Sequence, residues 1–228
     1  IAEMDRLGIQ KSVVLPIAMN LTFGDDASNE WFNAIRNTGL LDRLIPFASV
    51  HPNDPDKITK LRRYAELGMK GVKVHPTMQR IFPDSDAAME IYVEAGNLGI
   101  PVLWHSGRAG IEPALMQTYA TMDRYVRPIH ELPNVRFILG HAGAAMDWEQ
   151  AMLLARDNAN AWLELSGPSV PAMQAMIETA GPEKMMYGTD WAFYPQALAL
   201  AKVLIATHGD KAIRDQILHH TAAEVIGL

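Results

Sequence analysis

The stretch KGVKVHPTMQRIFPDSDAAMEIYVEAGNLGIPVLWH, residues 70–105, contains a complete strand–helix–strand unit. Its two ends, Lys70–His75 and Pro101–His105, are short apolar runs of the kind that form strands covered on both faces. Between them, the amphipathic segment Ala87–Leu98 predicts a helix that ends at Gly99, with a proline just beyond as a stop. The stretch therefore indicates one βα unit of a parallel sheet.

The same unit recurs along the chain, and successive strand-like runs begin 24 to 34 residues apart. The other runs are Ser12–Pro16, Leu44–Val50, Val135–His141, Asn160–Ser166 and Lys184–Asp190. Further helical patterns lie between them, at Ile58–Leu67, Ala145–Ala155, Met173–Ala180 and Ala197–Thr207. This alternation indicates parallel βα units, and the absence of a G-x-G-x-x-G turn argues against an open nucleotide-binding sheet.

The number of units favours a TIM-type (β/α)₈ barrel of the α/β class. Seven strand-like runs are present, and Ile1–Gly8 looks like the tail of a helix that should follow one more strand. We therefore expect a single barrel domain over residues 1–228 that is truncated at its N-terminus and lacks its first strand. We also expect a gap beside Ser12–Pro16 and Lys184–Asp190, filled by a partner chain or by residues outside this sequence, because sheets avoid open edges.

The composition excludes several classes of protein and of site. The 228 residues are 49% hydrophobic and 20% charged, as in an ordinary globular protein, and contain no cysteine, which excludes disulfides and a catalytic cysteine. The formal charge of −6 comes without a basic run, so no nucleic-acid partner is expected. No apolar stretch is long enough for a membrane span. We expect a cytoplasmic protein that acts on a small molecule, and homo-oligomerisation is left open.

Polar residues stand at the ends of four of the predicted strands: His75, His105, His141 and Asp190. Because the active site of such a barrel lies at the carboxyl ends of its strands, these side chains should converge on one rim. Imidazole and carboxylate groups suit a divalent metal, with zinc as the first choice and manganese or iron as alternatives. A bound metal would activate water or polarise a substrate oxygen, and a nearby His or Asp would move the proton.

Five motifs occur in an order that is specific as a set: GVKVHP (71–76), PVLWHSG (101–107), ILGHAGA (138–144), MYGTDWAFYP (186–195) and TAAEVIGL (221–228). Together they resemble the amidohydrolase superfamily. The nearest branch is amidohydrolase 2, which includes aminocarboxymuconate-semialdehyde decarboxylase and the pyrone-dicarboxylate lactonases. The resemblance extends over nearly the whole chain and implies the same barrel fold.

The resemblance implies roles for three of the strand-end residues. His105 corresponds to the metal ligand of the fifth strand, and Asp190 to the acid of the eighth strand, which binds metal, handles a proton or does both. His141 corresponds to the sixth-strand histidine, which transfers protons and orients substrate in mononuclear members and is a ligand in binuclear ones. The family's other ligand pair, an H-x-H on the first strand, has no counterpart in this sequence, which leaves metal binding by these residues open.

Four further residues are candidates for substrate binding: Lys73, His75, His51 and Arg108. Lys73 shares a strand face with His75 but lies one layer deeper, where an unpaired ammonium is costly. We expect it to pair with Asp190 or with a substrate carboxylate, and a carbamylated metal bridge, as in binuclear members of the superfamily, is the third alternative. His51 either contacts substrate or caps a turn, and Arg108 either clamps a carboxylate or is solvated.

Other side chains flank the predicted strand ends. Ser166 follows the seventh strand, and its hydroxyl is expected to cap the next turn. Trp104, Trp191 and Phe193 adjoin the predicted ligands, so that they either wall an aromatic pocket or pack between the barrel and its helices.

The sequence thus predicts a metal-dependent hydrolase that acts on a small carboxylated or cyclic substrate through metal-activated water. His141 and Asp190 are its expected catalytic residues, with His105 and Asp190 as metal ligands. Three alternatives remain. They are a non-oxidative decarboxylase of an aromatic or unsaturated carboxylic acid, a metal-independent lactonase in which Asp190 activates water, and a degenerate, non-catalytic barrel.

Overall fold

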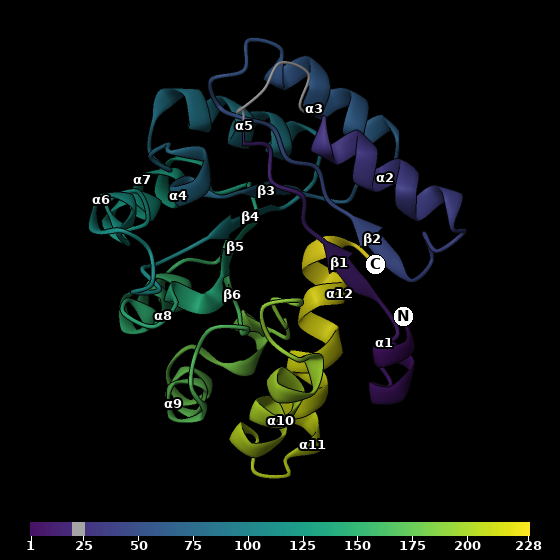
Figure 1. The fold of residues 1–228 in the computed structure, drawn as a ribbon. Helices are drawn as coiled ribbons and strands as arrows, with labels where there is room; N and C mark the ends of the chain where they lie inside the picture. The colour runs from purple at the N-terminus through teal and green to yellow at the C-terminus, as the bar shows by residue number, and fades with distance from the viewer. Residues whose placement is uncertain (20–25) are drawn as a thin grey trace.

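The structure is a computed structural model that describes residues 1–19 and 26–228 (Figure 1). This part of the chain contains seven short parallel strands, each followed by one or more helices. The strands are β1 (Ser12–Val14), β2 (Leu44–Pro46), β3 (Val72–Val74), β4 (Val102–His105), β5 (Phe137–Gly140), β6 (Ala161–Glu164) and β7 (Met185–Met186). The succession agrees with the expected α/β barrel.

Helices surround the strands (Figure 1). They are α1 (Ala2–Leu7), α2 (Ala27–Asn37), α3 (Lys57–Glu66), α4 (Pro76–Gln79), α5 (Asp86–Asn97), α6 (Ala114–Gln117), α7 (Asp123–Glu131), α8 (Trp148–Asp157), α9 (Val170–Ala180), α10 (Gln196–Ala206), α11 (Lys211–Asp215) and α12 (Thr221–Ile226). Side-chain caps fix several starts: the carboxylates of Asp26 and Asp210 accept backbone N–H groups at α2 and α11, and the Ser169 hydroxyl does so at α9. None of the described helices is both long and apolar enough to cross a membrane.

The strands pair in parallel, in the order of the chain. β1 pairs with β2, and the remaining strands form a second run in the order β3-β4-β5-β6-β7. A single bridge between Ala48 and Val72 connects the two runs, so that the order continues from β2 to β3. Among the described residues β1 and β7 are not paired with each other, and the barrel wall is therefore open at the expected place.

Most of the predicted strands extend beyond the observed ones, and the differences at β5 and β7 affect His141 and Asp190. The prediction for the last strand continued to Asp190, whereas β7 comprises only Met185–Met186, and β5 ends at Gly140, just before His141. At His141 the backbone leaves the extended conformation, with φ at 62°, and a 3-10 helix begins at this residue. Asp190 lies four residues beyond the end of β7 and also has a positive φ, at 50°.

Alternate strand residues face two different cores. On the outer side, under the helices, Trp104 packs against Tyr92, Tyr125 and Phe137, and its indole N–H donates to the Tyr92 hydroxyl at 3.0 Å. All four side chains are fully buried. Trp104 therefore takes the packing role, one of its two predicted alternatives, and does not wall a pocket at the strand ends.

The inner core is completed by the C-terminal helix. Leu103, Ile138 and Met186 point into the barrel, and Val225 and Ile226 of α12 pack against them. α12 also contacts β7, and it lies beside β1 in Figure 1. The helix therefore covers the interior next to the opening in the barrel wall.

Candidate active site

The structure brings the four predicted strand-end residues together. The rings of His75 and His105 are stacked, with centroids 4.2 Å apart and planes 9° apart. The ring of His141 meets His105 edge-on at 4.8 Å, and its Nδ1 lies 3.9 Å from Oδ2 of Asp190. One mouth of the barrel thus holds three imidazoles and a carboxylate. Their catalytic and ligand roles remain predictions.

Burial keeps the three imidazoles neutral. It lowers the pKa of His75 and of His141 well below the ordinary value and also lowers the pKa of His105. The positive charge of Lys73 lowers the pKa of all three rings further. At neutral pH each ring therefore has one N–H donor and one acceptor nitrogen.

Lys73 lies inside the barrel, beneath the histidines. It is 5% exposed, and its register partner on β4 is the inward-facing Leu103. Burial lowers the pKa of Lys73 to about 8, and the carboxylates of Glu164 and Asp190 oppose this shift. Both carboxylates act on the ammonium group electrostatically, but no carboxylate of the described residues lies within 4.0 Å of it, so the ion pair between Lys73 and Asp190 stays a prediction.

Sequence reasoning missed Glu164, which lies at the end of β6. Its Oε2 accepts the backbone N–H of His141 at 2.8 Å and the hydroxyl of Ser166 at 2.9 Å, while Oε1 accepts the backbone N–H of Ser166 at 2.9 Å. The contacts of the Ser166 hydroxyl are with side chains and not with the next turn, since its Oγ also lies 2.8 Å from Nδ1 of His141. One feature of the sequence could have indicated Glu164, because it is the one charged residue in the strand-like run Asn160–Ser166.

Glu112, in the loop between β4 and α6, is the second missed residue. Its Oε1 lies 3.5 Å from Nε2 of His105, and neither this nitrogen nor the other carboxylate oxygen, both buried, has a hydrogen-bond partner. His105 Nε2 and Glu112 Oε2, two atoms of the kind that can bind a metal ion, are therefore without a hydrogen-bond partner on neighbouring side chains. No pattern in the sequence around Glu112 distinguished it from an ordinary loop carboxylate.

The donor set does not form a complete metal centre. Among the residues that the structure describes, no three His, Asp or Glu side chains lie close enough together to hold one ion. His105 and Asp190, the ligands implied by the resemblance, thus fit a divalent cation only in part.

The other two substrate-binding candidates have structural partners. The guanidinium and backbone N–H of Arg108 donate to the buried carboxylate of Asp147, with Nε–Oδ2 and N–Oδ2 distances of 2.9 and 2.8 Å. The structure thus gives the guanidinium a partner within the chain, which neither alternative anticipated, and substrate binding by Arg108 stays a prediction. His51 contacts the Gln79 carbonyl through Nε2 at 3.0 Å and accepts the Asn53 N–H through Nδ1 at 3.1 Å, which agrees with its turn-capping alternative.

Trp191 and Phe193, the two aromatic residues predicted to wall a pocket beside Asp190, are exposed to solvent. Trp191 is 67% exposed and Phe193 is 84% exposed, on the loop that follows Asp190. A small cavity of about 110 Å³ adjoins the Ser166 side of the site, and its lining residues include Tyr194 and Lys202.

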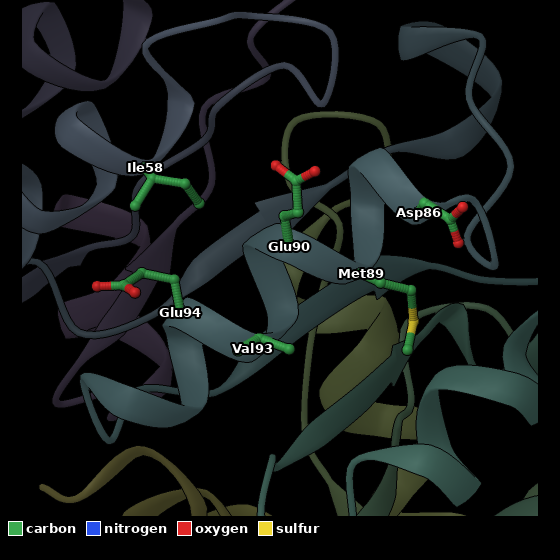
Figure 2. Close-up of a pocket in the computed structure, with 6 residues that line it drawn as sticks. All are labelled: Ile58, Asp86, Met89, Glu90, Val93 and Glu94. Atoms are coloured by element: carbon green, nitrogen blue, oxygen red, sulfur yellow. The ribbon is translucent and has the colours of Figure 1, made fainter.

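A larger hollow of about 400 Å³ lies elsewhere, between α3 and α5 (Figure 2). Figure 2 shows that its carboxylates, Asp86, Glu90 and Glu94, project from one face of α5. Each carboxylate has an ion-pair partner: Arg127 for Asp86, Lys57 for Glu90 and Arg62 for Glu94. Since its charges are paired and none of the strand-end residues lines it, the hollow is not the candidate site.

The comparisons with known proteins agree with this architecture. An uncharacterised TIM-barrel protein from Bordetella bronchiseptica superposes with a TM-score of 0.82 at 18% identity, over 99% of this chain and 80% of that one. The second neighbour is a 5-carboxyvanillate decarboxylase from Novosphingobium aromaticivorans, complexed with manganese and 4-hydroxy-3-methoxy-5-nitrobenzoic acid. Its TM-score is 0.76 at 18% identity, over 100% of this chain and 79% of that one. A probable 2-pyrone-4,6-dicarboxylic acid hydrolase from Acinetobacter baumannii superposes with a TM-score of 0.71 at 15% identity, over 100% of this chain and 87% of that one.

At these identities the structural neighbours establish the fold alone. No curated protein matches the chain. The family model described as amidohydrolase, however, matches residues 15–228, which is most of the sequence. The chain therefore belongs to the amidohydrolase family.

Proposed function

We propose that this protein hydrolyses a small carboxylated or cyclic substrate, with His141 and Asp190 moving the protons. The observation that carries the proposal is their juxtaposition at the barrel mouth, with Nδ1 of His141 3.9 Å from the Asp190 carboxylate. A neutral imidazole beside a carboxylate is suited to take a proton from water and to return it to a leaving group. Burial raises the pKa of Asp190, which brings its proton affinity closer to neutral pH.

Lys73 and the neighbouring imidazoles supply the binding side of this proposal. Lys73 is a buried cation at the base of the site, and the stacked rings of His75 and His105 lie above it. A substrate carboxylate that enters between these groups gains an ion pair and hydrogen-bond donors. The ester or amide carbon of the substrate then lies on the side of His141 and Asp190.

A metal-dependent form of the reaction, with zinc or another divalent ion, requires more donors than the described residues bring together. His105 and Asp190 would be ligands in such a centre, and Glu112 offers a further oxygen beside His105. The manganese held by the similar decarboxylase supports a divalent ion as the family's cofactor. A complete centre would activate water more strongly than a carboxylate does.

Decarboxylation is the second candidate. It is favoured by the burial of the site, because a carboxylate that is desolvated loses CO₂ more readily than one in water. Lys73 would hold the substrate, and His141 would deliver the proton that replaces the carboxylate on carbon. The similarity to a 5-carboxyvanillate decarboxylase supports this alternative as much as the hydrolase similarity supports the first.

The two reactions are separated with two probes, 2-pyrone-4,6-dicarboxylate and 5-carboxyvanillate. We expect ring opening of the pyrone, followed by its ultraviolet absorbance, and no release of CO₂ from either compound. His141→Asn and Asp190→Asn should each lower kcat by about 10²–10⁴-fold, the usual contribution of a positioned acid or base. His219→Asn, at an exposed position, is the control. CO₂ release would favour decarboxylation, whereas equal turnover in all variants would contradict both roles.

A further inference from the structure

Glu164 and Ser166 form a hydrogen-bonded arrangement on His141 that the proposed reaction does not yet use. From it we infer that these two residues hold His141 as the Nδ1–H tautomer, which leaves Nε2 as the nitrogen that exchanges protons with the substrate. The inference rests on the proposed function in one respect only, namely that His141 moves protons. The tautomer itself follows from the contacts.

The positions of the protons can be assigned from donors and acceptors. Backbone N–H groups only donate, and those of His141 and Ser166 point at the two oxygens of Glu164, at 2.8 and 2.9 Å. Both oxygens therefore act as acceptors, and these hydrogen bonds favour the ionised carboxylate against the burial that raises the pKa of Glu164. The Ser166 hydroxyl, 2.9 Å from Oε2, has one proton and donates it to this carboxylate.

With its proton directed at Glu164, the Ser166 oxygen can only accept from His141. Oγ and Nδ1 are 2.8 Å apart, which is a normal hydrogen-bond distance. The proton in that contact must then belong to Nδ1. A neutral imidazole has one N–H, so Nε2 has a free lone pair.

Asp190 does not perform this orienting role. Its Oδ2 lies 3.9 Å from Nδ1 of His141, beyond hydrogen-bond distance, whereas the Ser166 oxygen is 1.1 Å closer. Asp190 therefore remains available to a water molecule or to the substrate. Glu164 and Ser166 act through His141, and they are positioning residues in this reaction.

The tight packing at Gly188 and two hydrogen bonds of Lys202 hold Glu164 and Ser166 in position. A Cβ on Gly188 would lie 1.6 Å from Oε1 of Glu164, so only glycine leaves room for this carboxylate. The ammonium group of Lys202, from α10, donates to the backbone carbonyls of Ser166 and Pro168 at 2.9 and 3.0 Å. These contacts fix the turn that carries the Ser166 hydroxyl.

The tautomer is measured by long-range ¹H–¹⁵N NMR on the full chain with ¹⁵N-labelled histidine, and His141→Asn identifies the His141 signals by their loss. We expect a protonated, pyrrole-type Nδ1 and an unprotonated Nε2 in the unmodified protein. Ser166→Ala should give a mixture of tautomers, and Ser166→Thr, which keeps the hydroxyl, should restore the original spectrum. Ser169→Ala, which also loses a hydroxyl but only at the start of α9, should leave the His141 signals unchanged.

In the hydrolysis assay, Ser166→Ala and Glu164→Gln should lower kcat about 10- to 100-fold, as loss of a histidine's orienting partner commonly does. A protonated Nε2 in the unmodified protein would overturn the assignment, and so would an unchanged spectrum in folded Ser166→Ala. The expected spectra without turnover of either probe would instead contradict the proposed function and support the tautomer.

Discussion

His75 and His105 stack face to face, with ring centroids 4.2 Å apart and an interplanar angle of 9°. Burial lowers the pKa of both rings, and a charge on either one would also disfavour a charge on the other. Both effects favour the neutral form of each ring.

The pH dependence of stability should reflect these depressed pKa values. The unfolded chain takes up protons on His75 below about pH 6.5, whereas the folded protein resists them, so stability should fall as the pH is lowered from 7 to 5. His75→Asn removes the titrating ring and can still cap α4, so its Tm should decline less over this range. Burial raises the pKa of Asp190, which acts in the opposite direction, but this contribution is common to both proteins. Parallel Tm curves would refute the prediction, and His219→Asn is the control.

The pair of Arg108 and Asp147 should contribute to stability and not to substrate binding. Arg108→Ala leaves the buried Asp147 carboxylate without its main partner, which should lower the free energy of unfolding by about 1–3 kcal/mol in a urea titration. The KM of the variant for the pyrone probe should not change, because the guanidinium is held by Asp147. A large increase in KM with unchanged stability would restore the substrate clamp. Arg156→Ala, whose pair with Asp157 is exposed, is the control.

Metal binding should be weak in this chain. Because no three donor side chains converge among the described residues, titration calorimetry with MnCl₂ or ZnCl₂ should reveal no tight stoichiometric site. Prior treatment with a chelator should leave Tm unchanged. Tight binding that His105→Ala abolishes would show instead that Glu112 and Asp190 move to complete a centre around His105.

The packing of α12 on the inner core should be important for stability. Ile226→Ala removes a buried side chain from the barrel interior and should cost about 2–5 kcal/mol of unfolding free energy. Ile205→Ala makes the same chemical change at an exposed position on α10 and should have little effect. Equal effects of the two substitutions in urea titrations would show that α12 does not close the interior.

The sequence predicted the parts of this site that follow from strand order alone. Each of the four polar residues lies at or shortly after the end of a short apolar run: His75, His105, His141 and Asp190. Parallel strands bring their carboxyl ends to one rim of a barrel, so these residues were expected to converge there. The sequence did not show that His141 and Asp190 lie beyond the ends of β5 and β7 with positive φ values, because residue type does not specify that conformation.

Contacts set by loop paths were beyond sequence reasoning. Arg108 meets Asp147 from 39 residues away, and Glu112 reaches His105 through a turn with no regular periodicity. Glu164 looked like one residue of an apolar strand, and its role depends on the exact height of β6 relative to β5. Such pairings require the register of the strands, which a single sequence does not supply.

The position of α12 links two segments that are distant in the sequence. Val225 and Ile226 share one apolar cluster with Val13 of β1 and with Leu103, Ile138 and Met186 of β4, β5 and β7. Contacts between residues so far apart require a long segment of chain to be ordered first, which slows their formation. A variant in which α12 is detached would therefore expose the inner faces of these strands, an apolar surface of the kind that makes partly folded proteins aggregate.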